Sequence, residues 1–368
     1  MRVLIACGGT SGHINPAIAV AGEIKRRHLD AEILFIGTEN KLEADLVPRA
    51  GYKMEFIEIT GISRRKNFAA LKYNIKTVFK YTKARQKVKK IIKEFKPDIV
   101  FGTGGYVSAP VLSIAAAMGK KTAIHEQNAF AGVTTKMLAT KVDKVFLSFP
   151  LAHPIQMKDK NCQIVGNPVK AEFLKLSRLE ARQKLGIDEN VPFVLSYGGS
   201  LGAKKLNQAF CVMARKSAEE NFAFHYHGAA RDYEFVNEEL GAVAASSNIN
   251  VFEYIYNMPE AMAAADLIIS RSGAMTLTEL AALGRASILI PSPNVTENHQ
   301  YYNAKTYSDI GAAVLIEEKD LDGEKLYETV RTLLLDRSLL RKMEKAAKTL
   351  AKPNAAEKIC DGLEELLS

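Results

Sequence analysis

The sequence predicts an α/β protein made of two Rossmann-like domains with parallel sheets. Short apolar runs alternate with helical patterns along most of the chain, which is the order expected of βαβ units. The two halves also begin alike: "ACGGTSG" at 6–12 and "SYGGSLG" at 196–202 both place a cluster of glycines directly after a strand. A chain of 368 residues is long enough for two domains of ordinary size.

Apolar runs of about five residues are expected to form the buried strands. In the first half they are "RVLIAC", "EILFIG", "DIVFG", "KTAIHE" and "KVFLS", and in the second half "PFVLSYGG", "FAFHYHG", "INVFEYI", "DLIISRSG" and "ASILIPS". Helical patterns such as "NPAIAVAGEIKRR" separate them, so the connections should be right-handed crossovers. "VGNPV" at 165–169 interrupts this order, and we expect domains at 1–167 and 168–352. The last helix, 353–368, could pack on either domain.

Several classes of protein are excluded by composition. The four cysteines are far apart and form no CxxC pair, which argues against a disulfide framework and against a zinc site. The first residues, "MRVLIACGG", show no signal-peptide pattern. Residues 99–119 are uncharged and could span a bilayer by length, but three glycines and Pro110 break the run. We expect a buried strand, a glycine turn and a buried helix there.

The net charge of +9 is concentrated in one segment. Residues 64–96 contain thirteen Lys or Arg and one acid, Glu94, so this segment alone carries +12 and the rest of the chain is close to neutral. Such local basicity is typical of a surface that meets an anionic partner.

The glycine loops predict a ligand at the ends of the strands. A strand that runs through glycines into a helix presents free backbone N–H groups and the positive end of the helix dipole, which suit an anion or another polar ligand. Neither loop has the dinucleotide spacing GxGxxG, and Gly37 stands where an NAD site would need an acid. There is no GxxxxGK[ST] either, so neither an NAD site nor a Walker site is expected.

Polar side chains follow other strands. "GTGGY" at 102–106 and "HEQN" at 125–128 lie at predicted strand ends, where ligands of parallel sheets bind. In the second half, Glu279 lies early in the helix that begins near Ala274, where a carboxylate favours the helix dipole and can also accept two hydrogen bonds from a ribose diol. Gln300 follows a long polar loop, and its amide suits sugar hydroxyls.

Eight motifs in order resemble one family along nearly the whole chain. They are "GGTSGHINPAIAVA", "EADLVP", "GTGGYVSAP", "HEQNAFAG", "VGNPV", "GGSLGAKKLNQ", "RSGAMTLTEL" and "HQYYNA". Together they resemble the MurG family, the peptidoglycan N-acetylglucosaminyltransferases that convert lipid I to lipid II. The resemblance implies a GT-B glycosyltransferase fold, with two Rossmann-like domains facing across a cleft. It also implies that the last helix returns to the N-terminal domain, which would bind the acceptor and the membrane while the C-terminal domain binds UDP-GlcNAc.

The resemblance further implies which residues bind the substrates. Ser200 would contact the phosphates of UDP, Ile255 the uracil, Glu279 the ribose, and Gln300 and Asn128 the GlcNAc. The remaining donor contacts would come from Thr10, Ser11, Gly12, Lys170 and the helix start Ala274, Met275, Thr276, Leu277, Thr278. The acceptor would contact Gly104, Gly105, Tyr106 and His125. Lys170 stands where some members have Arg, and His299 replaces one member of a Gln pair, so these two positions depart from the family pattern.

The implied reaction is an inverting displacement by the 4-hydroxyl of MurNAc, which needs a general base. His13 is the leading candidate, because a histidine side chain ordinarily titrates near neutrality and this one lies at a helix start on the first glycine loop. It could instead cap that helix, and Glu126 and His125 are alternative bases. Helix N-termini can stabilise the leaving diphosphate, and the one D-x-D, at 320–322, looks like a loop or helix start, so we expect no cofactor and no obligatory metal ion.

The basic segment fits a membrane surface. Its apolar positions and lysines alternate at helical spacing, which suits an interfacial helix on anionic lipid; the membrane contacts would be Leu71, Ile75, Phe79, Lys72 and Lys80. The alternative is an ordinary amphipathic helix with a solvated charged face. A lipid-linked acceptor favours membrane contact, and hence a peripheral protein at the cytoplasmic face of the plasma membrane.

Two other functions stay open at this point. A related GT-B transferase that glycosylates diacylglycerol would share the UDP half and the basic segment. A non-catalytic nucleic-acid-binding protein would explain the +12 segment, but no aromatic stacking platform or groove-reading motif accompanies it. Nucleic acid is therefore not an expected partner, and the sequence does not give the oligomeric state.

Overall fold

The chain folds into two compact units, seen here in a computed structural model. The structure describes residues 1–59, 68–151, 153–157, 161–199, 202–295 and 298–368, with no side-chain description for 68–81 and 172. Unit 1 comprises Met1–Lys170 and Pro353–Ser368, and unit 2 comprises Ala171–Lys352. The two units are described separately below.

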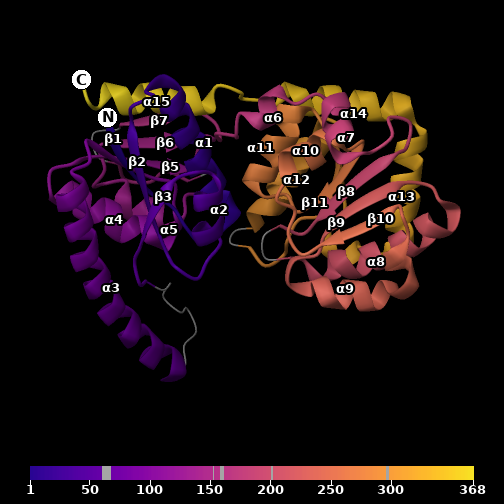
Figure 1. Cartoon of the computed structure of the whole chain (residues 1–368), viewed down its shortest axis with the longest axis horizontal. Coiled ribbons are helices and arrows are strands. Elements are labelled where there is room, and N and C mark those ends of the chain that lie inside the picture. The colour runs from indigo at the N-terminus through magenta and orange to yellow at the C-terminus, as the bar shows by residue number, and fades with distance from the viewer. Residues whose placement is uncertain (60–67, 152, 158–160, 200–201, 296–297) are drawn as a thin grey trace. The chain divides into compact units, whose positions relative to one another are not determined.

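Unit 1 contains a seven-stranded parallel sheet in the order β3-β2-β1-β4-β5-β6-β7. Its strands are β1 (Arg2–Ala6), β2 (Glu32–Gly37), β3 (Lys53–Phe56), β4 (Ile99–Gly102), β5 (Lys121–Glu126), β6 (Lys144–Leu147) and β7 (Cys162–Ile164). Its helices are α1 (Ser11–Arg27), α2 (Glu43–Arg49), α3 (Phe68–Phe95), α4 (Gly105–Ala117), α5 (Val133–Leu138) and α15 (Ala355–Glu365). The central strands are buried because helices cover both faces of the sheet (Figure 1).

Unit 2 contains a six-stranded parallel sheet in the order β10-β9-β8-β11-β12-β13, the strand order of a Rossmann domain. Its strands are β8 (Phe193–Tyr197), β9 (Phe224–Gly228), β10 (Ile249–Phe252), β11 (Leu267–Ser270), β12 (Ala286–Leu289) and β13 (Ala313–Leu315). Its helices are α6 (Glu172–Lys175), α7 (Arg178–Leu185), α8 (Lys204–Glu220), α9 (Tyr233–Leu240), α10 (Met258–Ala264), α11 (Ala274–Leu283), α12 (His299–Asp309), α13 (Gly323–Leu335) and α14 (Arg337–Thr349). Short 3₁₀ turns are η2 (Ala230–Asp232), η3 (Gly241–Ala245) and η5 (Glu318–Asp320).

The predicted interior strands are all present, and three further strands are not among those predicted. β3, β7 and β13 lie at sheet edges, and β3 and β7 contain no fully buried residue. β3 and β7 therefore carry no continuous apolar run, and β13 has only three residues, whereas β10, also at an edge, was predicted from its apolar residues. The uncharged segment 99–119 forms β4, a glycine turn and α4, as predicted. Within the described residues, no helix is both long and apolar enough to cross a membrane.

The last helix, α15, packs against α1 in unit 1. Arg27 at the end of α1 donates to Asp361 at 2.7 Å and to the Glu357 carbonyl at 3.0 Å. Lys144 at the start of β6 donates to Glu365 at 2.5 Å. Of the two domains on which this helix could pack, it packs on the first.

The second half of α3 anchors this helix to unit 1. Ala84, Val88, Ile91 and Ile92 are buried in the core, whereas the intervening basic residues are exposed. The N-terminal end of α3 extends away from the sheet (Figure 1). The predicted membrane residues Leu71, Lys72, Ile75, Phe79 and Lys80 fall in this end of the helix, and their side chains lie outside the described part.

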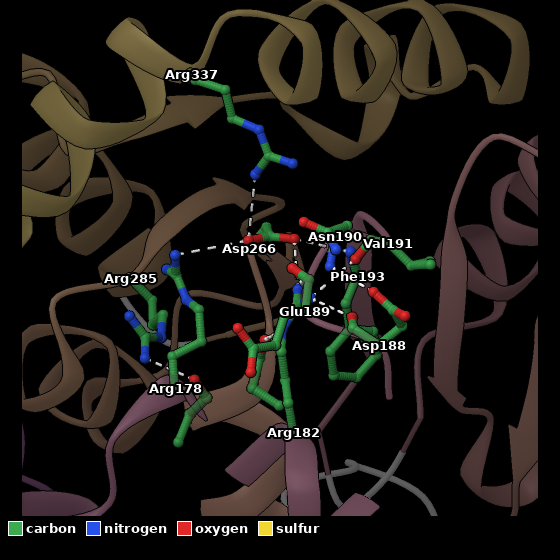
Figure 2. A network of polar contacts seen from close by, with 12 residues as sticks. Arg178, Arg182, Asp188, Glu189, Asn190, Val191, Phe193, Asp266, Arg285 and Arg337 are labelled. Atoms are coloured by element: carbon green, nitrogen blue, oxygen red, sulfur yellow. Dashed lines mark hydrogen bonds and ion pairs between the residues drawn. The ribbon is translucent and has the colours of Figure 1, made fainter. Parts of the chain in front are cut away.

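A buried cluster of ion pairs lies at the amino ends of the strands of unit 2 (Figure 2). The glycine loop of this unit lies at the opposite end, after β8. Asp266, just before β11, accepts from Arg182 at 2.7 Å and from the Phe193 backbone at 2.9 Å. Figure 2 shows Arg178 and Arg337 also directed at this carboxylate, at 3.6 and 3.5 Å. Because Arg182 is itself buried, removing Asp266 would leave an uncompensated charge and cost on the order of 3–5 kcal/mol.

Candidate functional site

The glycine loop of unit 1 connects β1 to α1 and holds a buried carboxylate beside it. Glu43 of α2 is fully buried and accepts hydrogen bonds from the Gly9 amide at 3.0 Å and from the Thr38 amide and hydroxyl at 3.1 and 2.6 Å. This charge would repel a phosphate. Of the two ligands that the loop predicts, the structure therefore favours a neutral polar group over an anion.

His13 lies in the first turn of α1, half-buried, with its ring held by the loop after β4. Its Nδ1 lies 2.9 Å from the Thr103 carbonyl oxygen and 2.9 Å from Oε1 of Gln127. The Thr103 hydroxyl also donates to the His13 carbonyl at 2.7 Å. The cap on α1 is therefore not the role of this side chain, since Thr10 occupies the N-cap position and the imidazole bonds to other elements.

Two predicted acceptor residues, Gly104 and Gly105, explain how the backbone approaches this histidine. Both have positive φ values, +97° and +73°, which favour glycine. A Cβ at Gly104 would lie 3.0 Å from Cε1 and Nδ1 of His13, and one at Gly105 would lie 2.4 Å from the Gly8 carbonyl oxygen. The two glycines thus bring the start of α4 against the first glycine loop. Tyr106, the third predicted acceptor residue, is half-buried beside them.

The polar cluster after β5 is mostly buried, and this corrects the role predicted for His125. This ring has no exposed surface, and its Nε2 donates to the Gly166 carbonyl at 2.9 Å. Burial lowers the pKa of His125 to about 4, so the ring is neutral at physiological pH. A side chain with no exposed surface cannot contact an acceptor, and a neutral, fully enclosed ring is also a poor candidate for the base.

Glu126 orders the loop that follows it. Its carboxylate accepts from the amides of Asn128 and Gly132 at 3.1 and 2.9 Å, and from the Thr135 hydroxyl at 2.5 Å. The Asn128 side chain donates to the same carboxylate at 3.3 Å and is half-buried. Both oxygens of Glu126 are thus engaged in holding the loop, which leaves His13 as the better placed of the alternative bases.

In unit 2, the start of α11 is open to an anion. Its N-cap residue, Gly273, makes no side-chain cap bond, and the first turn of this helix contains no acidic residue. This differs from the first glycine loop, where the Glu43 carboxylate accepts a hydrogen bond from the Gly9 amide. The five predicted residues at 274–278 form this helix start. The amide of Leu277 donates to the Gly273 carbonyl at 3.1 Å, so the N–H groups that lack a partner within the helix are those of 274–276, at its positive end.

The predicted sugar and nucleoside residues of unit 2 lie at the carboxyl ends of its strands. Glu279 lies on α11 and is mostly buried, and Ile255 follows β10 and packs against Gly228. The Gln300 carbonyl accepts from Ser272 at 2.7 Å, and its side-chain oxygen accepts from the Ser292 amide at 2.9 Å. The first bond ties α12 to the turn that precedes α11, and the second ties it to the loop that follows β12.

The remaining predicted positions are Ser200, Lys170 and the D-x-D at 320–322. Ser200 lies outside the described residues. Lys170 is half-buried at the end of unit 1. In the D-x-D, Asp322 caps α13 by accepting from the Lys325 amide at 3.0 Å, as expected of a helix start. Among the described residues, no cluster of three His, Cys, Asp or Glu side chains could hold a metal ion.

The contacts that Glu43, Thr103 and Gln127 make at this site are absent from the sequence prediction, which includes Gln127 only as one of the polar residues after a strand. Thr103 acts through its backbone carbonyl, which no sequence pattern reports. Glu43 and Gln127 fall within the motifs "EADLVP" and "HEQN", but an acid near a helix start and an amide after a strand have ordinary structural explanations.

The comparisons with known proteins agree with this architecture. Residues 3–147 match the glycosyltransferase family 28 N-terminal domain, and residues 193–359 match the glycosyltransferase family 28 C-terminal domain. The chain is 45% identical, over 100% of its length and 98% of the relative, to the "UDP-N-acetylglucosamine--N-acetylmuramyl-(pentapeptide) pyrophosphoryl-undecaprenol N-acetylglucosamine transferase" of Acetivibrio thermocellus. This chain belongs to glycosyltransferase family 28. A relative of the same name from Bacillus cytotoxicus is 41% identical, with both chains covered in full.

Solved structures give the same result for family 28 and its fold. MurG of Acinetobacter baumannii is 30% identical with a TM-score of 0.70, and 99% of each chain is covered. CalG4, the calicheamicin glycosyltransferase, has a TM-score of 0.67 over 100% of this chain and 98% of its own. At 14% identity, CalG4 supports the fold alone. The predictions of a GT-B glycosyltransferase, with two Rossmann-like α/β domains, and of its family are confirmed.

Proposed function

We propose that this enzyme transfers GlcNAc from UDP-GlcNAc to the MurNAc 4-hydroxyl of lipid I, the undecaprenyl-diphosphate-linked MurNAc-pentapeptide, and so forms lipid II for peptidoglycan synthesis. The observation that carries this proposal is full-length identity of 45% to a relative named for that transfer. The geometry supplies a neutral-ligand loop with a histidine in unit 1 and an open helix start in unit 2.

In the reaction, the MurNAc 4-oxygen attacks the anomeric carbon of GlcNAc while the bond from that carbon to the UDP oxygen breaks. The hydroxyl proton passes to Nε2 of His13, and UDP leaves as an anion. Attack opposite the leaving group inverts the anomeric centre. Nε2 can accept the proton because the Thr103 carbonyl at 2.9 Å can only accept, so Nδ1 of His13 must be the protonated ring nitrogen.

The donor would bind to unit 2. The N–H groups at 274–276 and Ser200 would hold the diphosphate, with Leu277 and Thr278 beside it. Ile255 would contact the uracil, Glu279 the ribose diol and Gln300 the sugar. Thr10, Ser11, Gly12, Asn128 and Lys170 would complete the donor contacts, and Gly104, Gly105 and Tyr106 would contact the acceptor. The charge that develops on UDP is stabilised by the positive helix end, so we expect transfer without a divalent ion.

The acceptor assignment is tested with UDP-GlcNAc radiolabelled in the sugar. The protein is incubated in detergent with lipid I or with diacylglycerol, and label in the lipid fraction is counted. Transfer to lipid I alone supports the proposal. Transfer to diacylglycerol alone would keep the donor assignment and overturn the acceptor.

We further propose that α3 holds the enzyme on the anionic cytoplasmic surface of the plasma membrane. Its described half buries an apolar face and exposes basic residues, and lipid surfaces attract each such charge by about 1 kcal/mol. Sedimentation with anionic vesicles at low salt should capture the protein, and salt should release it. The double variant Lys83→Glu, Lys87→Glu should weaken capture more than 10-fold, whereas the exposed pair Lys342→Glu, Lys345→Glu on α14 should not. Equal capture of both variants would contradict this surface.

A further inference from the structure

A chain of hydrogen bonds leads from the segment after β7 to the proposed base. Nδ1 of His13 lies 2.9 Å from Oε1 of Gln127, although 114 residues separate them in the sequence. The same Nδ1 lies 2.9 Å from the Thr103 carbonyl. Because both oxygens accept, the proton of the neutral ring is on Nδ1, shared between them, and the lone pair is on Nε2.

The orientation of the Gln127 amide is fixed from its other side. Its Nε2 lies 3.0 Å from Nδ1 of His125 and donates to the Thr103 carbonyl at 2.8 Å. The Gly166 carbonyl lies 2.9 Å from Nε2 of His125 and can only accept, so this ring carries its proton on Nε2. Nδ1 of His125 is then an acceptor, and a flipped amide would face it with an oxygen instead of a donor.

Burial keeps this assignment constant with pH. His125 has no exposed surface, and burial lowers its pKa to about 4, so the ring gains no proton near neutrality, while the Gly166 carbonyl keeps its one proton on Nε2. Ser148 lies 3.1 Å from the same Nε2 and donates to Asn167 at 2.6 Å, and Asn167 donates to the Gln127 carbonyl at 3.1 Å. These bonds hold the backbone of Gln127 and the ring of His125 in place, and so fix the two groups between which the side-chain amide of Gln127 lies.

We propose that Gln127 is the positioning residue of the catalytic base, with His125 setting the direction of its amide. The proposal rests on His13 acting as the base. Each donor in the chain points the same way, from His125 to Gly166, from Gln127 to His125 and from His13 to Gln127, which leaves the lone pair at Nε2 of His13. A neutral amide orients the imidazole without adding a negative charge that would stabilise its protonated form.

The other charged and titratable groups near His13 stay unchanged when Gln127 is substituted. Glu43 on α2 bonds to Gly9, and Glu126 at the end of β5 bonds to its own loop. Tyr106 lies in the first turn of α4, and His125 is near enough for the charge of His13 to contribute to lowering the pKa of His125, after burial. A change in pH dependence on substitution of Gln127 alone therefore reports its contact with His13.

The kinetic test compares wild type with Gln127→Glu and Gln127→Met. A carboxylate 2.9 Å from Nδ1 would stabilise the protonated imidazole, so the acidic limb of kcat/KM for the acceptor should move to higher pH by about 1 unit or more in Gln127→Glu. Gln127→Met should lower kcat roughly 10-fold and change KM for UDP-GlcNAc less than twofold. Gln183→Glu, an exposed change on α7, is the matched control and should leave the limb in place.

A second measurement separates this proposal from the assignment of the base. In protein labelled with ¹⁵N-histidine, the His13 signal is identified by its loss in His13→Ala, and the ring tautomer is measured without substrate. The proposal expects Nδ1–H in wild type and a protonated ring that persists to higher pH in Gln127→Glu. An Nε2–H tautomer, or a titration unchanged in Gln127→Glu, would overturn the positioning contact. If the titration moves as expected but His13→Ala turns over normally, the contact exists and its catalytic role is overturned.

Discussion

The Glu43 carboxylate accepts a hydrogen bond of 3.0 Å from the Gly9 amide, 34 residues earlier in the chain. Its other oxygen accepts from the amide and hydroxyl of Thr38. Through these bonds a fully buried acid of α2 fixes the loop that carries His13. The same charge distinguishes the first glycine loop from the helix start at Gly273, where the first turn contains no acidic residue.

Glu43→Gln should destabilise the protein by roughly 1–3 kcal/mol. Each carboxylate oxygen of Glu43 accepts hydrogen bonds, one from Gly9 and the other from Thr38, whereas an amide has only one oxygen. The change is measured by urea unfolding. Asp45→Asn on the same helix removes a half-exposed charge paired with Arg49 and should cost less than about 1 kcal/mol. Equal stability of Glu43→Gln and wild type would show that this carboxylate does not hold the loop.

His13→Ala should lower kcat by roughly 10²-fold or more, since general bases contribute in that range. Binding of UDP-GlcNAc, measured by calorimetry, should change little if the donor binds mainly to unit 2, as we propose. His28→Ala, at the other end of α1, is the control and should turn over normally. Near-normal turnover of His13→Ala would remove the histidine from the mechanism.

Glu279→Ala should raise the Kd for UDP-GlcNAc about 10-fold or more if its carboxylate accepts from the ribose diol, since hydrogen bonds to charged groups contribute about 1.5–3 kcal/mol. The sharper measurement repeats the titration with the 2′-deoxyribose analogue of the donor. Wild type and Glu279→Ala should differ less for this analogue than for UDP-GlcNAc, whereas Glu238→Gln on the surface of α9 should bind both ligands as wild type does. If Glu279→Ala raised the Kd equally for UDP-GlcNAc and for the 2′-deoxyribose analogue, Glu279 would not bind the ribose diol.

The free energy of unfolding should fall as the pH drops from about 6.5 to 4. Burial lowers the pKa of His125 and His225 to about 4 and that of His227 to about 3. Below pH 6.5 the unfolded chain binds protons that the folded chain excludes, so stability is lost on acidification and regained as the pH rises. Each histidine contributes up to about 1.4 kcal/mol per pH unit in this window.

Urea midpoints at pH 7 and pH 5 measure this loss. His225→Gln should reduce the difference between the two midpoints, whereas His153→Gln, an exposed substitution, should preserve it. If His225→Gln loses as much stability on acidification as wild type does, burial of this ring is not a source of the pH dependence.

The sequence predicted the interior of both sheets because strands buried on two faces must be apolar throughout. It missed the edge strands β3, β7 and β13, which have only three or four residues, because β3 and β7 contain no continuous apolar run and β13 is too short to show a pattern. The glycine loops and His13 could likewise be found from local patterns. The contacts that orient His13 could not, since Thr103 and Gln127 lie 90 and 114 residues away and one of them acts through its backbone. Burial of His125 also depends on distant packing, so its predicted contact with the acceptor was wrong.

The stereochemistry of the product tests the central claim most directly. Wild-type protein is incubated with UDP-GlcNAc and lipid I in EDTA, and the new glycosidic bond is examined by proton NMR. The account predicts a β bond to the 4-oxygen of MurNAc, formed without a divalent ion. An α bond, a bond to another oxygen, or hydrolysis of UDP-GlcNAc without transfer would contradict inverting attack by the MurNAc 4-hydroxyl.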